Sequence, residues 1–117
     1  MTEKEVKTIE DKQEINKIIE EKIKGKRLIF TDWYKMGLLQ KGISEDKFNE
    51  VFPQFDKVSV IEIEKLKKGD LGYELFYKLS NNTTISIGTT PKENTLLIIH
   101  LIEYKRNLDY RFKKFKR

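Results

Sequence analysis

The spacing of the apolar residues changes once along this chain of 117 residues, and that change constrains the fold more than any other sequence feature. Before Lys57 the apolar residues mostly recur at helical intervals, whereas after it most of them alternate with polar residues. Helices followed by strands that are joined by short turns are typical of an α+β domain. We therefore expect N-terminal helices packed on an antiparallel sheet of about four to five strands.

The first segment is expected to form a helix from Thr2 to Lys24. Thr2 and Glu5 have the spacing of a capping box, and Gly25 follows the last helical residue as a stop signal. Four isoleucines fall within one helical stripe, namely Ile9, Ile15, Ile19 and Ile23. This stripe indicates a helix that either covers the sheet or forms the contact of a homodimer.

A short strand and two short helices should follow. Residues 28–30 form an apolar run that fits a strand. Thr31 or Asp32 can cap a helix over residues 33–40, because their side-chain oxygens accept hydrogen bonds from the first turn. Ser44 can cap the second helix in the same way.

Four strands are expected after Lys57, at residues 58–64, 73–79, 83–89 and 96–102. The two halves of the first strand alternate out of phase by one residue, which predicts a bulge near Val60 and Ile61. The last strand shows no polar alternation. It should therefore be a central strand that is buried on both faces.

One domain is expected for a chain of this length, made of the N-terminal helix (residues 1–25), an α+β core (28–103) and a basic tail (104–117). The tail holds seven basic residues and one acidic residue, whereas residues 1–103 hold 17 basic and 18 acidic residues. A localised basic patch attracts polyanions, because neutralised phosphates release counterions. The aromatic residues of the tail also offer flat faces on which unpaired bases stack.

The tail also has structural interpretations. Tyr104, Leu108, Phe112 and Phe115 recur at helical spacing, so they fit a buried stripe with Lys and Arg on the solvated side. An amphipathic helix on a membrane surface is a third interpretation. We nevertheless expect no membrane partner, and the longest apolar run, residues 96–102, is far too short to span a bilayer.

Several classes of function are excluded by composition. The chain has no cysteine, which rules out disulfides, thiolate zinc sites and thiol catalysis. It has no glycine-rich phosphate loop of the P-loop or dinucleotide kind. Residues 1–5 lack the pattern of a secretory signal, so we expect a cytoplasmic protein. We expect neither a metal nor a cofactor.

Few residues suggest chemistry of their own. His100 is alone in an apolar strand, where a histidine is usually a hydrogen-bonded core residue. Glu62 and Glu64 share one face of their strand, which fits either a solvated surface or a pair that binds a divalent cation. Metal-free cleavage of RNA remains a possible activity, because this reaction needs only groups that hold the phosphate and move protons.

The stretch Gly72–Leu79 reads Gly-Tyr-Glu-Leu-Phe-Tyr-Lys-Leu, and an apolar strand follows that ends in Tyr104, Lys105 and Arg106, with Tyr110 shortly after. This pattern resembles the C-terminal half of the RelE-type ribonuclease toxins, which belong to the barnase/RelE superfold. The resemblance implies an α+β domain that binds RNA and cleaves it without a metal. It also implies a cognate protein partner, as in a toxin–antitoxin pair.

Our leading hypothesis is therefore an RNA-binding protein with metal-independent endoribonuclease activity of the RelE type. Lys105 and Arg106 would hold phosphate, Tyr110 would stack or transfer a proton, and His100 would act as a general base if it reaches the sheet surface. The candidate catalytic residues are His100, Arg106 and Tyr110. The candidate nucleic-acid-binding residues are Tyr104, Lys105, Arg106, Arg111, Phe112, Lys113 and Lys114.

Two alternatives stay open. Toxins of this type carry basic residues where this chain has Glu62, Glu64 and Glu74. That replacement favours a non-catalytic protein-interaction module, such as an inhibitor, an immunity protein or a virus-encoded host-binding protein. The other alternative is a small DNA-binding protein that uses the sheet and the tail.

Overall fold

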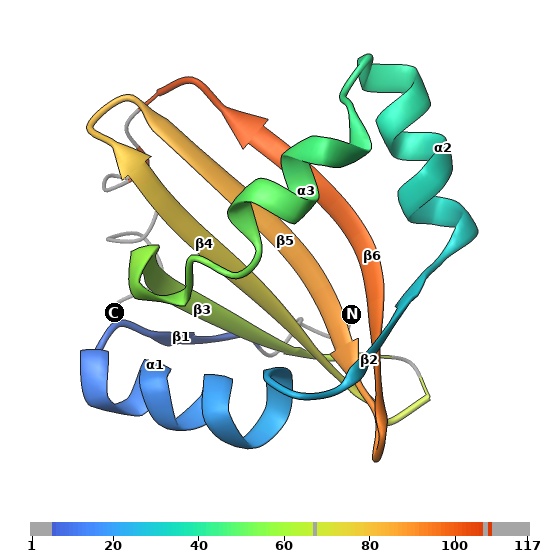
Figure 1. Ribbon diagram of the computed structural model, residues 1–117. Coiled ribbons are helices and arrows are strands. Elements are labelled where there is room, and N and C mark those ends of the chain that lie inside the picture. Colours follow the sequence, from blue (N-terminus) through green and yellow to red (C-terminus); the bar gives the residue numbers. More distant parts are fainter. Residues whose placement is uncertain (1–5, 67, 107, 109–117) are drawn as a thin grey trace, which may run out of the picture.

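Three helices lie on one face of a six-stranded sheet in the computed structural model, which describes residues 6–66, 68–106 and 108 (Figure 1). The strands are β1 (Val6–Ile9), β2 (Arg27–Phe30), β3 (Val58–Lys65), β4 (Leu71–Ser80), β5 (Thr83–Pro91) and β6 (Thr95–Tyr104). The helices are α1 (Lys12–Ile18), which a π-helical turn η1 (Ile19–Ile23) continues, α2 (Asp32–Lys41), α3 (Glu45–Val51) and a 3-10 turn η2 (Phe55–Lys57). The α+β class is thus confirmed. None of the described helices is long and apolar enough to cross a membrane.

The N-terminal helix begins ten residues later than its sequence pattern predicts. Residues 6–9 form β1, an edge strand in which Ile9 lies opposite Ile61 of β3. Asp11 is the N-cap of α1, and its carboxylate accepts a hydrogen bond from the Glu14 N–H at 2.9 Å. The expected helix was wrong for residues 6–9. Ile9 is β-branched and therefore also suits a strand, and pairing with the edge of β3 favours the strand over the helix.

The rest of the isoleucine stripe is confirmed. Ile15, Ile19 and Ile23 are buried against the sheet. Thr2 and Glu5, the expected capping box, lie outside the described residues.

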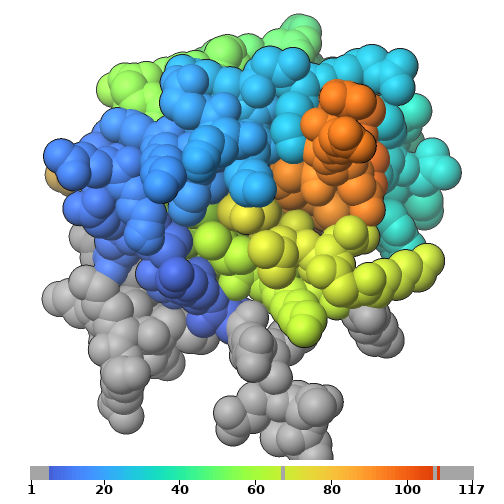
Figure 2. All heavy atoms as spheres, turned by 90° about the horizontal axis from the view of Figure 1, so that it is seen from below, coloured from blue at the N-terminus to red at the C-terminus, as the bar shows by residue number. Residues whose placement is uncertain are grey.

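The sheet has the strand order β1-β3-β4-β5-β6-β2, so the expected count of four to five strands was too low. Strands β3 to β6 form the expected antiparallel meander. β1 adds an antiparallel edge, whereas β2 adds a parallel edge beside β6, which makes the sheet mixed. Between β2 and β3, helices α2 and α3 carry the chain over one face of the sheet. Figure 2 shows the start of β6 (orange) beside the segment around β2.

Among the described residues, helices cover β6 on one face only, which corrects the expectation of a strand buried on both faces. Leu96, Ile98 and Leu101 are fully buried on the side of α2. On the other side Ile102 and His100 are only half-buried. The strand lies next to the edge of the sheet, and the three helices all pack on the same face.

The caps and turns follow their sequence signals. The Thr31 hydroxyl accepts a hydrogen bond from the Tyr34 N–H and donates one to the Ile98 carbonyl at 2.8 Å. Gly42 ends α2 with a φ of 66°, a conformation that favours glycine, and Ser44 caps α3. The bulge in β3 lies between Val58 and Val60, slightly earlier than expected.

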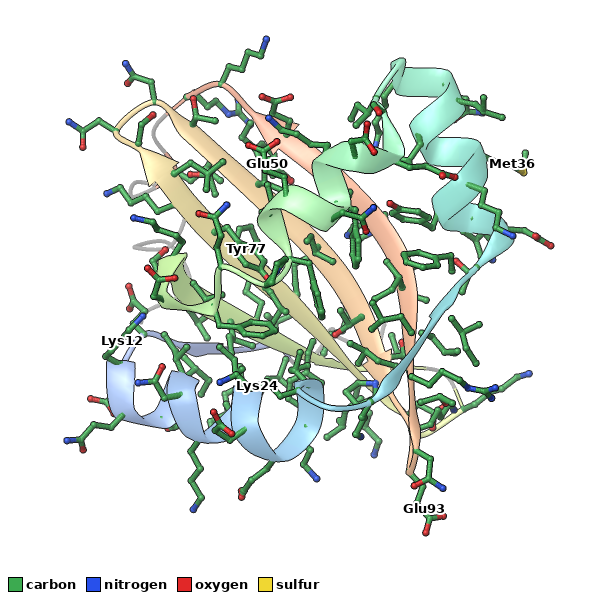
Figure 3. All side chains as sticks on the ribbon, in the orientation of Figure 1. Lys12, Lys24, Met36, Glu50, Tyr77 and Glu93 are labelled. Carbon is green, nitrogen blue, oxygen red and sulfur yellow. The ribbon has the colours of Figure 1, made fainter. Side chains whose placement is uncertain are left out.

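Tyr77 joins the sheet to the helical layer. Its ring is completely buried, and its hydroxyl donates to the Phe52 carbonyl at 2.7 Å (Figure 3). Burial raises the pKa of Tyr77, so the hydroxyl stays a neutral donor. Burial and the nearby Glu45 carboxylate raise the pKa of Tyr34 to about 12.

Replacing Asp11 tests the corrected start of α1. We expect Asp11→Ala to lower the free energy of unfolding by about 1 kcal/mol, because the Glu14 N–H loses its side-chain acceptor. Asp11→Asn keeps an acceptor oxygen and should stay within a few tenths of a kcal/mol of the parent. Urea denaturation followed by circular dichroism measures both, and an unchanged Ala variant would contradict the assignment.

Candidate binding groove on the open face of the sheet

The face of the sheet opposite the helices, here called the open face, carries a groove of about 440 Å³. Cross-strand partners project to the same side of a sheet, so the ladder registers identify the strand residues of this face. Among the described residues, strands supply most of the lining of the groove, and Trp33 is the one lining residue that belongs to a helix. Its polar and aromatic lining includes Trp33, Glu62, Glu64, Glu74, His100 and Tyr104.

One row of residues crosses four strands on the floor of the groove. Glu62 of β3 lies opposite Glu74 of β4. Glu74 lies opposite Gly88 of β5, and Gly88 lies opposite His100 of β6. The row therefore places two carboxylates, a glycine and an imidazole side by side on one face.

His100 reaches Glu74 across the strand between them. Its Nε2 lies 2.8 and 2.7 Å from the two carboxylate oxygens. β4 and β6 are two strand spacings apart, roughly 10 Å, so the ring must lean over β5 to make this contact. Gly88 leaves room for the ring because it has no side chain. A Cβ at this position would lie only 2.7 Å from Nε2 and 2.9 Å from Cε1 of the imidazole, too close for either atom to stay in place.

The pair has a defined chemistry. A carboxylate only accepts hydrogen bonds, so Nε2 of His100 carries the hydrogen that it donates to Glu74. That leaves Nδ1 as the ring nitrogen that is not engaged by Glu74. The His100 side chain is 37% exposed, so it is accessible from the groove as well as held by Glu74.

The groove is acidic. Glu62 is only 8% exposed, so the interpretation of its strand face as solvated was wrong for this residue. Glu62 and Glu74 are directly opposite, an arrangement in which like charges disfavour the fold. Glu64 lines the groove two residues further along β3. Among the described residues that line it there is no Lys or Arg.

Within the described part of the chain, no group of three His, Cys, Asp or Glu side chains could hold a metal ion. A divalent cation bound by Glu62 and Glu64 would therefore find no third ligand of these types among the described residues.

The groove continues into an apolar cluster at the end of β6. Tyr104 lines the groove and packs beside Val60, Phe76 and Leu108. Leu108 is 4% exposed, so the chain beyond β6 crosses back onto the open face at this residue. Tyr104 is the last residue of β6.

The sequence-predicted site residues divide into three groups. His100 and Tyr104 lie in the groove. Lys105 and Arg106 are exposed just beyond it, and the Arg106 guanidinium lies 5.9 Å from the centre of the Tyr104 ring. Five candidates lie outside the described residues, namely Tyr110, Arg111, Phe112, Lys113 and Lys114.

Among the groove residues that sequence reasoning did not single out as site residues, three determine its chemistry, namely Glu74, Gly88 and Trp33. Gly88 did carry a signal, because a lone glycine inside a strand pattern often marks a close approach of another group. Glu74 was noted only as a departure from a family pattern, and Trp33 as part of an expected helix over residues 33–40. Their role depends on the strand register and on where α2 begins.

Comparison of this chain with protein-family models, with curated proteins and with solved structures finds no match.

Gly88→Ala tests the geometry of the pair. The added methyl would overlap the imidazole, so we expect the His100–Glu74 hydrogen bond to break and the free energy of unfolding to fall by about 1–3 kcal/mol. His100 is the single histidine of the chain, so its ring proton signals are assigned directly in a one-dimensional NMR spectrum. In Gly88→Ala, the chemical shifts of the His100 ring protons should move toward the values of a free histidine.

Gly72→Ala is the matched control, because its Cβ would meet Leu66 at 3.5 Å, an ordinary contact. The geometry is refuted if the two alanine variants give the same His100 spectrum as the parent.

Proposed function

We propose that this chain is a protein-interaction module whose open-face groove binds a basic segment of a partner protein. One observation supports this most strongly: Glu62, Glu64 and Glu74 line the same groove, and no Lys or Arg is among its described lining residues. A surface of one sign selects a partner of the other sign and suppresses like-charged ones.

Arginine and lysine side chains suit this groove in two ways. A guanidinium donates paired hydrogen bonds to a carboxylate such as that of Glu64 or Glu74, and these charge-assisted bonds are stronger than neutral ones. Trp33 and Tyr104 add ring faces that attract a cation by its interaction with the π-electrons.

The same groove is poorly suited to hold RNA for cleavage. Cleavage needs cations or hydrogen-bond donors around the scissile phosphate, whereas this floor presents carboxylates. His100 could still move a proton through Nδ1, but its Nε2 is held by Glu74. In the resemblance to the RelE-type toxins, Glu74 stands where those toxins carry a basic residue. The groove therefore supports the protein-interaction alternative better than the endoribonuclease.

Binding of an arginine homopeptide tests the proposal. Trp33 lines the groove and is the single tryptophan of the chain, so its fluorescence reports on occupancy. We expect the double variant Glu64→Gln/Glu74→Gln to bind about tenfold more weakly than the parent, because two charge-assisted hydrogen bonds are lost. Glu50→Gln/Glu93→Gln removes the same charge from exposed positions outside the groove (Figure 3) and should change affinity by less than about threefold.

A glutamate homopeptide serves as the ligand control. Equal affinity of the two double variants, or equal binding of both homopeptides, would exclude a groove that selects basic segments.

RNA binding outside the groove is a second candidate function. Lys105 and Arg106 are exposed at the end of β6, and Arg106 lies over the Tyr104 ring, so a cation and a flat ring are adjacent there. Such a combination suits a single-stranded polyanion whose bases stack. This is the part of the RelE-type hypothesis that the described residues support.

Oligouridine binding tests this second candidate. We expect Lys105→Ala/Arg106→Ala to weaken binding and to reduce the slope of log affinity against log salt by about 1.4, since two phosphate contacts are lost. Lys17→Ala/Lys22→Ala removes the same charge from exposed positions on the helical side and should leave the slope unchanged. Fluorescence anisotropy measures both. An unchanged slope in the first variant argues against RNA at this site, and equal affinity for duplex DNA favours the DNA-binding alternative.

A further inference from the structure

Helix α2 is apolar on two opposite faces. Tyr34 and Leu38 are buried under it, at 2% and 4% exposure. On the other side Trp33, Met36 and Leu39 are 77%, 56% and 82% exposed. Figure 3 shows Met36 pointing away from the sheet. A surface helix normally keeps that outer face polar, so the second apolar face is unusual.

The three exposed residues form a continuous surface, here called the α2 stripe. They are spaced by three residues, which places them within an arc of about 120° and along about 9 Å of the helix axis. Large apolar side chains that gather on a surface mark a contact site for another molecule.

The α2 stripe and the acidic groove share one residue. Trp33 is both the first residue of the stripe and part of the lining of the groove. A ligand that contacts Trp33 from the groove therefore lies directly beside Met36 on the helix surface. The two features together make one surface that is acidic at one end and apolar at the other.

We infer that the partner segment is an amphipathic helix that places an arginine or lysine in the acidic groove and packs its apolar residues on the α2 stripe. This inference rests on the proposed function and narrows it to one kind of segment. An apolar stripe about 9 Å long matches two turns of a partner helix, with apolar residues at positions i, i+3 or i+4, and i+7.

A second copy of this chain is a poorer occupant than such a segment. A dimer that is symmetric about a two-fold axis brings the same patch of both copies together. Pairing two α2 stripes would then bring the groove with Glu64 and Glu74 close to its own copy, and like charges repel. A basic amphipathic segment satisfies both ends of the surface.

Selection from a random peptide library displayed on phage tests this inference with the full chain as bait. From the parent we expect peptides enriched in Arg or Lys beside apolar residues at helical spacing. Met36→Ser/Leu39→Ser should lose the apolar enrichment and keep the basic one. Glu64→Gln/Glu74→Gln should lose the basic enrichment. The control Glu50→Gln/Glu93→Gln should select the same peptides as the parent.

A selected peptide is then synthesised and titrated while Trp33 fluorescence is recorded. We expect a shift of the emission to shorter wavelength, and about tenfold weaker binding to Met36→Ser/Leu39→Ser than to the parent. These two side chains are exposed, so their replacement should leave the thermal midpoint close to that of the parent.

The outcomes separate the inference from the proposed function. Basic peptides without apolar enrichment overturn the inference and leave the proposed function standing. Apolar peptides without basic residues, or acidic peptides, overturn the proposed function. Failure to enrich any peptide overturns both. Self-association of the parent in sedimentation, abolished by Met36→Ser/Leu39→Ser, would show that a second copy occupies the stripe and would also overturn the inference.

Discussion

The hydrogen bond between His100 and Glu74 determines the character of the open face, and it depends on the absence of a side chain at Gly88. The imidazole spans β5 and joins β4 to β6, so groups two strands apart act as one pair. Without that contact the floor of the groove would carry carboxylates with no imidazole held against them. With it, the floor carries carboxylates and one imidazole that is held in a fixed position by Glu74.

The described helices cover one face of the sheet, which explains why a polar row survives on the opposite, open face. The helices pack on the side where Ile61, Leu75 and Ile87 are fully buried. The part of the chain that the structure describes places no helix over the open face, so the same strands can carry charged residues at the alternate positions. The close approach of Glu62 and Glu74 disfavours the fold, and natural proteins accept such local costs mainly where a surface serves binding.

Sequence reasoning succeeded where the signals are local and failed where pairing between distant strands decides. Thr31, Gly42 and Ser44 stand at the helix ends that their chemistry predicts. The strand at residues 6–9 was mistaken for a helix, because its one buried residue, Ile9, fits both periods and the free edge of β3 cannot be seen in the sequence. The same limit applies to the site, since a row that crosses four strands is set by register rather than by spacing along the chain.

The parallel pairing of β2 with β6 has a consequence for how the molecule acquires its groove. The Thr31 hydroxyl that caps α2 is bonded to the Ile98 carbonyl, 67 residues away along the chain. During synthesis α2 therefore has no strand to dock on until the last strand emerges from the ribosome. Trp33 and His100, which both line the groove, therefore come together only at that stage. The groove is in this way a feature of the finished molecule and is acquired late.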